Sequence, residues 1–173
     1  MNIASFRRGV LMVAASLLFT SGGTAFAQGS ASTQMQVTAS VPATCTITSP
    51  VALAFGNYDP VVSNATAALN VSPNALSVAC TTGVTAKVGL DNGQNYSAPN
   101  RRMTNGATTA AYLIYQIYTS AARTTIWNTT NTVSYTAASR NPTPLPVYGQ
   151  IPGGQDVPVG TSYADTVTAT ITF

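Results

Sequence analysis

Strict alternation of apolar and polar residues marks two segments, one near each end of the chain. Segment 33–41 reads TQMQVTASV, and its apolar members at every second position are Met35, Val37, Ala39 and Val41. Segment 165–173 reads DTVTATITF, and its apolar members at every second position are Val167, Ala169, Ile171 and Phe173. Because successive side chains of a strand point to opposite faces, this period of two predicts a one-sided β-strand in each segment.

Between these segments, short β-rich runs alternate with Gly, Pro, Asn and Asp, which mark turns. The runs are TCTITS (44–49), ALSVACTT (75–82), VTAKVGL (84–90), AAYLIYQIYTS (110–120), weaker strands around Trp127 and Tyr135, and LPVYGQIP (145–152). Prolines frame the last of these runs, which favours an edge strand or a sheet boundary, and the polar segment 94–109 is predicted to be a loop. Six or seven short strands predict an all-β, antiparallel sandwich of the immunoglobulin-like kind.

The first 27 residues have the composition of an export signal. MNIASFRRG carries two arginines, VLMVAASLLF is apolar, and Ala25 and Ala27 flank Phe26. These are the three regions of a secretory signal peptide, and the apolar run is shorter than the roughly 20 residues of a membrane-spanning helix. We therefore expect cleavage after Ala27. The sequence divides into a signal peptide, an N-terminal extension and one domain, at residues 1–27, 28–43 and 44–173.

Export changes how the cysteines and the charge are interpreted. Cys45 and Cys80 are the two cysteines, and an exported chain most simply pairs them. Such a disulfide stabilises a fold by roughly 3–4 kcal/mol in the chain-entropy model. Removal of two signal-peptide arginines leaves five of the seven basic residues against four acidic ones, a net charge of +1. This balance does not favour nucleic acid as a partner, and the adjacent Arg101 and Arg102 are predicted to lie in a solvated turn.

The side chains give little support to catalysis. There is no histidine, so neither a Ser-His-Asp nor a Cys-His arrangement can form, and no residue set has the spacing of a metal site. The aspartates lie beside turn residues or a final strand, where they usually bond to nearby backbone. We therefore predict a protein that is not an enzyme and uses no cofactor or metal. Its aromatic residues leave a carbohydrate-binding module as an alternative, although their alternation with aliphatic residues favours packing.

Several motifs follow one another in an order that is specific in combination. They are FGNYDP, GLDNGQN, RRM, YLIYQIY, WN, PVYGQIP and GTSYADTVTATITF, and they extend over roughly Met35 to Phe173. Together they resemble the spore coat protein U domain family, which includes the pilins of archaic (Csu-type) chaperone–usher pili. The resemblance implies an incomplete immunoglobulin-like sandwich that is completed by donor strand exchange. A periplasmic chaperone fills the vacancy first, and at an outer-membrane usher the N-terminal segment of a neighbouring subunit replaces it.

The resemblance gives the two alternating segments complementary roles. Segment 33–41 would be the donor strand, and its buried side would be formed by Met35, Val37, Ala39 and Val41. The acceptor groove would be bordered by the strand that begins near Cys45 and by a last strand whose free edge no later strand of the sequence covers. The edge residues of that last strand would be Val167, Ala169, Ile171 and Phe173. The pattern alone serves equally well for an alternative in which 33–41 is the first strand of a complete sandwich.

The predicted function is that of a structural pilin subunit in a surface fimbrium, assembled by a chaperone–usher pathway and serving adhesion and biofilm formation. Its partners would be a periplasmic chaperone, an outer-membrane usher and neighbouring pilin subunits, in a homopolymer or a mixed fibre. Its route would lead through the periplasm to the cell surface or to secretion. A structural spore or cell coat protein is the main alternative. A charged fraction of 6% agrees with either assembly, because charges normally protect strand edges from edge-to-edge association.

Overall fold

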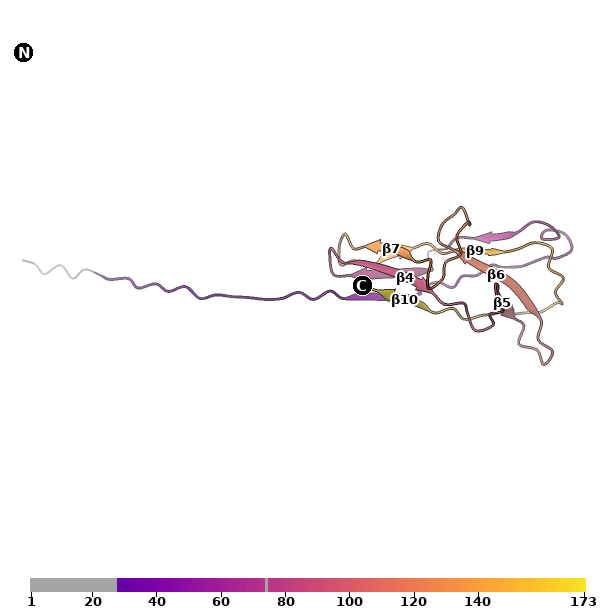
Figure 1. Ribbon diagram of the computed structural model, residues 1–173, viewed down its shortest axis with the longest axis horizontal. Coiled ribbons are helices and arrows are strands. Elements are labelled where there is room, and N and C mark those ends of the chain that lie inside the picture. The colour runs from indigo at the N-terminus through magenta and orange to yellow at the C-terminus, as the bar shows by residue number, and fades with distance from the viewer. Residues whose placement is uncertain (1–27, 74) are drawn as a thin grey trace, which may run out of the picture. The chain divides into compact units, whose positions relative to one another are not determined.

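The computed structural model describes residues 28–73 and 75–173, so the predicted signal peptide, residues 1–27, lies outside the described residues. The chain forms two units. The described part of the first unit, residues 28–39, has no regular secondary structure, and Met35 and Val37 are each 83% exposed. The second unit, Ser40–Phe173, contains the ten strands of the described chain (Figure 1). Among the described residues, no helix has the length and apolarity that crossing a membrane requires.

The strands pair in three antiparallel groups. The first group has the order β1–β3–β8, formed by Cys45–Thr48, Leu76–Cys80 and Thr143–Leu145. The second has the order β10–β4–β7, formed by Ala169–Thr172, Thr85–Leu90 and Val133–Thr136. The third has the order β2–β9–β6–β5, formed by Leu69–Val71, Tyr148–Ile151, Tyr112–Tyr118 and Arg101–Thr104. The all-β, antiparallel architecture predicted from the sequence is confirmed.

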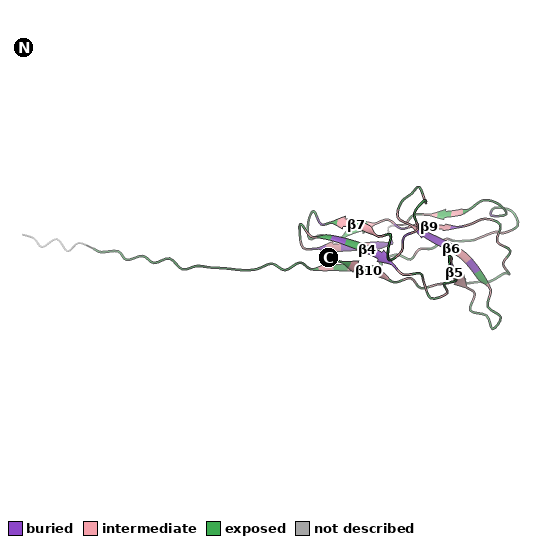
Figure 2. Ribbon diagram, viewed as in Figure 1, coloured by how far each residue is buried: buried purple, intermediate pink, exposed green. Residues whose placement is uncertain are grey.

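The core is built from the inward faces of these strands. On β3 the buried residues are Leu76, Val78 and Cys80, and on β6 the most deeply buried apolar residues are Leu113, Tyr115 and Ile117, as the alternation predicts. Figure 2 shows buried segments on β4 and β6, separated by partly covered or exposed ones. Each fully buried side chain of this size contributes roughly 1.5–3 kcal/mol. Cys45 and Cys80 form the predicted disulfide, opposite each other in the β1–β3 ladder.

The prediction that Arg101 lies in a solvated turn is wrong. Arg101 begins β5, inside the segment that was expected to be a loop, and is 1% exposed. Its guanidinium Nε donates to the carbonyl of Asp91 at 3.0 Å and its Nη2 to the carbonyl of Trp127 at 2.8 Å. Backbone carbonyls from distant parts of the chain therefore replace water around this cation, and a local sequence pattern does not reveal such partners.

The segment 145–152 forms parts of two strands. β8 ends at Leu145 and β9 begins at Tyr148, so the chain passes from one hydrogen-bonded group to another at Pro146 and Val147. The sheet-boundary prediction is confirmed for this segment. The other alternative, an edge strand, does not apply to β9, which lies between β2 and β6. Pro146 and Pro152 flank β9 and lie outside it, so their missing N–H groups remove no ladder hydrogen bond.

Candidate functional site

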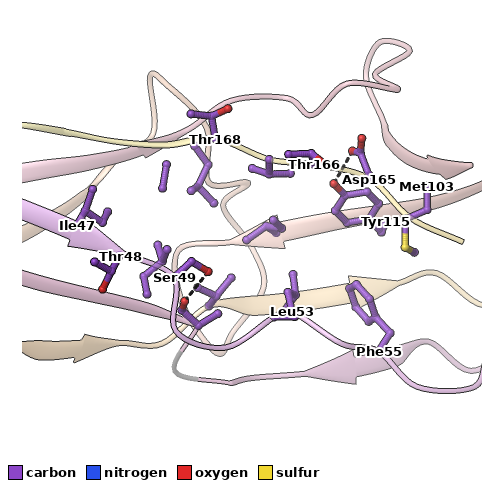
Figure 3. A pocket seen from close by; sticks show the side chains of 18 residues that line it. Ile47, Thr48, Ser49, Leu53, Phe55, Met103, Tyr115, Asp165, Thr166 and Thr168 are labelled. Carbon is purple, nitrogen blue, oxygen red and sulfur yellow. Dashed lines mark hydrogen bonds between the residues drawn. The ribbon is translucent and has the colours of Figure 1, made fainter. Parts of the chain in front are cut away.

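An apolar cavity of about 610 Å³ opens between β1 and β10 (Figure 3). Its apolar lining residues come from all three strand groups and from the segment after β1, and they are Ile47, Ala52, Leu53, Phe55, Ala75, Leu76, Leu90, Met103, Tyr115, Ile117, Val147, Val167 and Ala169. Its polar lining residues are Thr48, Ser49, Asp165, Thr166 and Thr168. We call this space the groove cavity.

The groove cavity lies between two open strand edges. Among the described strands, β1 is hydrogen-bonded to β3 alone and β10 to β4 alone, although β1 and β10 lie side by side. The end of β3 leads through residues 81–84 to the start of β4, and both β1 and β10 are antiparallel to their partners. It follows that β1 begins and β10 ends at the same end of the domain. The two strands therefore run in opposite directions along the groove.

Ladder hydrogen bonds identify the backbone groups of β10 that point into the groove. The N–H of Asp91 donates to the carbonyl of Thr168 at 2.9 Å, which places Thr168 in a hydrogen-bonded pair with the β4 side. In an antiparallel ladder such pairs alternate with pairs whose N–H and C=O groups point away. The residues that direct their backbone groups to the open edge are therefore Val167, Ala169 and Ile171.

The same reasoning applies to β1. The N–H of Thr81 donates to the carbonyl of Thr44 at 2.9 Å, so Thr44 is paired with β3. The backbone groups that alternate with it point to the groove, and they belong to Cys45, Ile47 and Ser49. Both borders of the groove thus combine half-buried or cavity-lining side chains with unpaired peptide groups.

Asp165 fastens the wall of the groove that leads into β10. Its Oδ2 accepts a hydrogen bond from the hydroxyl of Tyr115 at 2.7 Å, and Figure 3 shows this bond beside the cavity. Its Oδ1 accepts the backbone N–H groups of Gln94 at 3.0 Å and Asn95 at 3.2 Å. Burial, and then the hydrogen bond to Asp165, raise the pKa of Tyr115 far above its ordinary value, so the phenol remains a donor. The wall is therefore held by side-chain bonds as well as by the β10–β4 ladder.

Asp91 supports the same wall from the end of β4. Its Oδ1 accepts the N–H groups of Gly93 at 2.9 Å and Thr168 at 3.0 Å. Burial acts to raise the pKa of this carboxyl, but the hydrogen bonds from Thr168 and Gly93 outweigh it and hold the pKa below 3.8. Gly93 has a φ of 78°, and a Cβ there would collide with Oδ2 of Asp165. This turn therefore requires a glycine.

Comparison with known proteins identifies the family. Residues 31–170 match the model of the Spore Coat Protein U domain. The chain belongs to the Spore Coat Protein U domain family. It is 43% identical over 129 residues to Protein U of Myxococcus xanthus, an alignment that covers 70% of this chain and 71% of that protein.

A solved structure is also similar to this Spore Coat Protein U domain. It is the chaperone–tip adhesion subunit pre-assembly complex from archaic chaperone–usher Csu pili of Acinetobacter baumannii. The TM-score is 0.49 at 20% sequence identity, and the match covers 77% of this chain. The chain spans 40% of the length of that solved chain.

Of the residues that the sequence singled out in this Spore Coat Protein U domain, some line the groove cavity and others do not. Val167 and Ala169 line it, Ile171 packs against the core, and Phe173 is 55% exposed after the end of β10. No strand is assigned within residues 33–41, so the candidate donor residues Met35, Val37, Ala39 and Val41 belong to no sheet of the described chain.

Sequence reasoning missed the floor of the groove. Leu53 and Phe55 line the cavity from a segment that is not a strand, and the ring of Phe55 meets that of Tyr115 edge-on at a centroid distance of 6.1 Å. The motif FGNYDP contains the only local signal, because it places an aromatic residue directly before a turn. Trp127 is fully buried and its Nε1 donates to the carbonyl of Val88 at 2.8 Å. Its ring is therefore not exposed for stacking on a sugar.

The prediction that aspartates bond to nearby backbone is confirmed for Asp91, which accepts the N–H of Gly93, and for Asp59. Asp165 also bonds to backbone, but its partners Gln94 and Asn95 lie 71 and 70 residues away in sequence. Oδ1 of Asp59 accepts the N–H groups of Val61 at 2.9 Å and Val62 at 3.1 Å. Among the described residues, no group of three or more His, Cys, Asp or Glu side chains is placed to hold a metal ion.

Proposed function

We propose that this Spore Coat Protein U domain is a structural subunit of a surface fimbrium that is assembled by a chaperone–usher pathway through donor strand exchange. Segment 33–41 of one copy would occupy the groove cavity of another copy. The observation that supports this most directly is the pair of open edges on β1 and β10 with apolar residues between them. Unpaired backbone groups beside apolar pockets form a template for an added strand.

The candidate donor strand fits this template in length and pattern. Nine residues at about 3.3 Å each extend for about 30 Å, and the eight-residue wall 165–172 extends for about 26 Å. One face of the donor carries Met35, Val37 and Val41, each of which would contribute roughly 1.5–3 kcal/mol on burial, and the smaller Ala39. Its backbone would pair with the ladder groups of Val167, Ala169 and Ile171 on one side and with those of β1 on the other. Where β1 and β10 contact each other, insertion would separate them to two strand spacings, about 9.5 Å.

An open groove of this kind also accounts for the proposed partners. Before assembly, its apolar floor and unpaired edges would favour uncontrolled association. A periplasmic chaperone that lends a strand would prevent this association, and an outer-membrane usher would direct the exchange to the next subunit. The subunit would leave the cell through the periplasm, and the resulting fibre would serve adhesion and biofilm formation at the cell surface.

A chain-termination experiment tests donor strand exchange. A variant that lacks residues 28–41 keeps the groove cavity but has no donor strand, so it can accept a neighbour and cannot donate. Added to the full chain together with the chaperone, it should shorten the fibres in proportion to its share. A matched variant with residues 28–41 present and Val37→Asp should behave in the same way. Full-length subunits that remain monomeric, folded and equally heat-resistant without a chaperone would contradict the proposal.

A structural coat protein of a spore or cell is the second candidate. The family description and the 43% identity to Protein U support it. The same exchange of strands could build a coat, so the two candidates differ in where the polymer is found. Immunogold electron microscopy of growing and resting cells separates them, because a fimbrium gives labelled filaments and a coat gives labelled envelopes.

A further inference from the structure

The connection between segment 33–41 and β1 is short and is fastened to the domain. Val41 and Cys45 are four Cα steps apart, which span at most about 14 Å. The hydroxyl of Thr81 donates to the carbonyl of Pro42 at 3.1 Å, and its N–H donates to the carbonyl of Thr44 at 2.9 Å. These bonds continue the pairing of β1 with β3 beyond the disulfide. The chain therefore enters β1 in line with that strand.

This geometry determines how an inserted strand runs. Because β1 and β10 run in opposite directions, a strand between them is antiparallel to one and parallel to the other. A strand antiparallel to β1 could come from the same chain through a three-residue hairpin loop, and it would then fill the chain's own groove. The bonds from Thr81 oppose this hairpin, because they hold Pro42 and Thr44 in line with β1. A strand parallel to β1 cannot come from the same chain, because the connection would have to return along about 26 Å of groove wall. Exchange between copies therefore favours the orientation antiparallel to β10.

In this orientation the two bodies meet through opposite ends. We call the end of the domain with the disulfide, residues 81–84 and residues 137–142 the disulfide pole. The other end, with residues 56–63 and 156–162, is the far pole. The donor strand would leave the groove at the far pole of the accepting copy, and its connection is so short that the disulfide pole of the donating copy must lie against that pole.

The far pole has the features of a contact surface. A second cavity of about 580 Å³ opens there and shares Leu53, Phe55 and Met103 with the groove cavity, so the groove continues to this end. Beside it, Val61 is 81% exposed and Val159 is 100% exposed. Apolar side chains gathered around the mouth of a cavity are typical of a surface that a partner covers.

The two poles also differ in charge. Of the four aspartates, Asp91 and Asp165 are bonded at the groove wall, whereas Asp59 and the exposed Asp156 lie at the far pole. The turn that contains Asp59 packs against the segment before Asp156, because the hydroxyl of Tyr58 accepts the N–H of Gln155 at 2.9 Å. At the disulfide pole, Arg140 is exposed in the loop after β7. Opposite poles therefore attract, and like poles repel.

We propose that successive copies in the fibre make a second contact besides the donor strand, in which the disulfide pole of the donating copy packs on the far pole of the accepting copy. Arg140 of the donating copy faces Asp59 and Asp156 of the accepting copy, beside the exposed valines. This inference rests on the proposed donor strand exchange. The contact fixes the angle between neighbouring bodies, so it determines the stiffness of the fibre and leaves the strength of the donor-strand joint unchanged.

A charge-reversal experiment with rescue tests this contact. Fibres of the full chain are compared with Arg140→Glu, Asp156→Arg and the double variant, and with Arg140→Lys as the charge-conserving control. Persistence length is measured on electron micrographs at low salt. We expect each single reversal to shorten it about twofold, and both the double variant and the control to retain the original value. Every variant should keep the same detergent-resistant ladder of subunits, because the donor strand is not altered.

The outcomes distinguish the two proposals. If the unaltered chain forms no fibres and no detergent-resistant ladder, donor strand exchange fails and the second contact fails with it. Fibres whose stiffness is equal in all variants overturn the second contact alone. A double variant that is as flexible as the single variants also overturns it, because the two charges would then not face each other.

Discussion

The hydroxyl of Tyr115 donates a 2.7 Å hydrogen bond to Oδ2 of Asp165 and so joins the floor of the groove cavity to its wall. Tyr115 comes from β6 and is 4% exposed, and Asp165 precedes β10. The same carboxylate binds the turn that follows β4. Open grooves need such fixation, because a strand edge without a partner has no ladder on one side to keep it in place.

Asp165→Ala should therefore destabilise the domain. The methyl group accepts neither the hydroxyl of Tyr115 nor the N–H groups of the turn, so buried donors are left unsatisfied, which costs about 1–3 kcal/mol. Tyr115→Phe removes one of these bonds alone and should have the smaller effect. The free energy of unfolding in urea, measured for both variants, checks this order. Equal losses for the two variants would mean that the bonds to the turn contribute nothing.

The lowered pKa of Asp91 predicts a loss of stability in acid. A carboxyl whose pKa is depressed on folding contributes stability that is complete above its unfolded value, here 3.8, and that is lost as the pH falls through the folded value. The midpoint temperature of thermal unfolding should therefore decrease as the pH is lowered below about 4. Asp91→Asn should reduce this fall without abolishing it, because the hydrogen bonds from Val62 and Val61 also lower the pKa of Asp59. Scans between pH 6 and pH 2 check the prediction.

The two glycines Gly93 and Gly106 offer a matched test of the groove wall. Both have positive φ, at 78° and 69°, but a Cβ on Gly93 would collide with Asp165, whereas a Cβ on Gly106 would meet nothing within 4 Å. Gly106→Ala should cost roughly 1–2 kcal/mol for the backbone conformation alone. Gly93→Ala should cost clearly more, and the difference measures the displacement of Asp165. Similar unfolding free energies for both variants would show that the side chain of Asp165 can move aside at no cost in stability.

The local sequence pattern predicted those features of the fold that depend on neighbouring residues alone. The alternation of apolar and polar residues identified the inward faces of β3, β6 and β10, because every second side chain of a strand points to the same face. It did not give β2 or β8, which have three residues each and are too short to show a period. Arg101 was misassigned because its partners, the carbonyls of Asp91 and Trp127, lie 10 and 26 residues away in sequence.

The residues of the groove cavity also differ in how far the local sequence pattern identifies them. Val167 and Ala169 line the cavity, and the alternation of their segment singled them out. Leu53 and Phe55 were not assigned to the groove, because a segment without regular structure has no period that indicates which side chains face inward. Which strand edges stay open depends on long-range pairing, and pairing of that kind is set by the whole chain.

The face of the donor strand can be tested with two adjacent residues. Val37 belongs to the apolar set of segment 33–41, and Gln36 belongs to the polar set. Val37→Lys should abolish the detergent-resistant ladder of subunits, because a buried lysine replaces a side chain whose burial contributes roughly 1.5–3 kcal/mol. Gln36→Lys should leave the ladder intact. Equal loss in both variants would contradict a one-sided donor.

The shortness of the connection between Val41 and Cys45 makes a final prediction. If this connection prevents a chain from filling its own groove in the orientation antiparallel to β10, lengthening it should remove the barrier. An insert of about 12 Gly and Ser residues between Val41 and Pro42 extends far enough to return along a wall of about 26 Å. The tethered strand then acts at an effective concentration in the millimolar range and competes with every neighbour. The variant should be monomeric in light scattering and more heat-resistant than a variant without residues 28–41. The control carries the same insert before Gln28, which leaves the connection unchanged, and should give fibres of normal length. If both inserted variants form fibres, the length of the connection does not determine whether a donor strand fills its own groove or that of a neighbour.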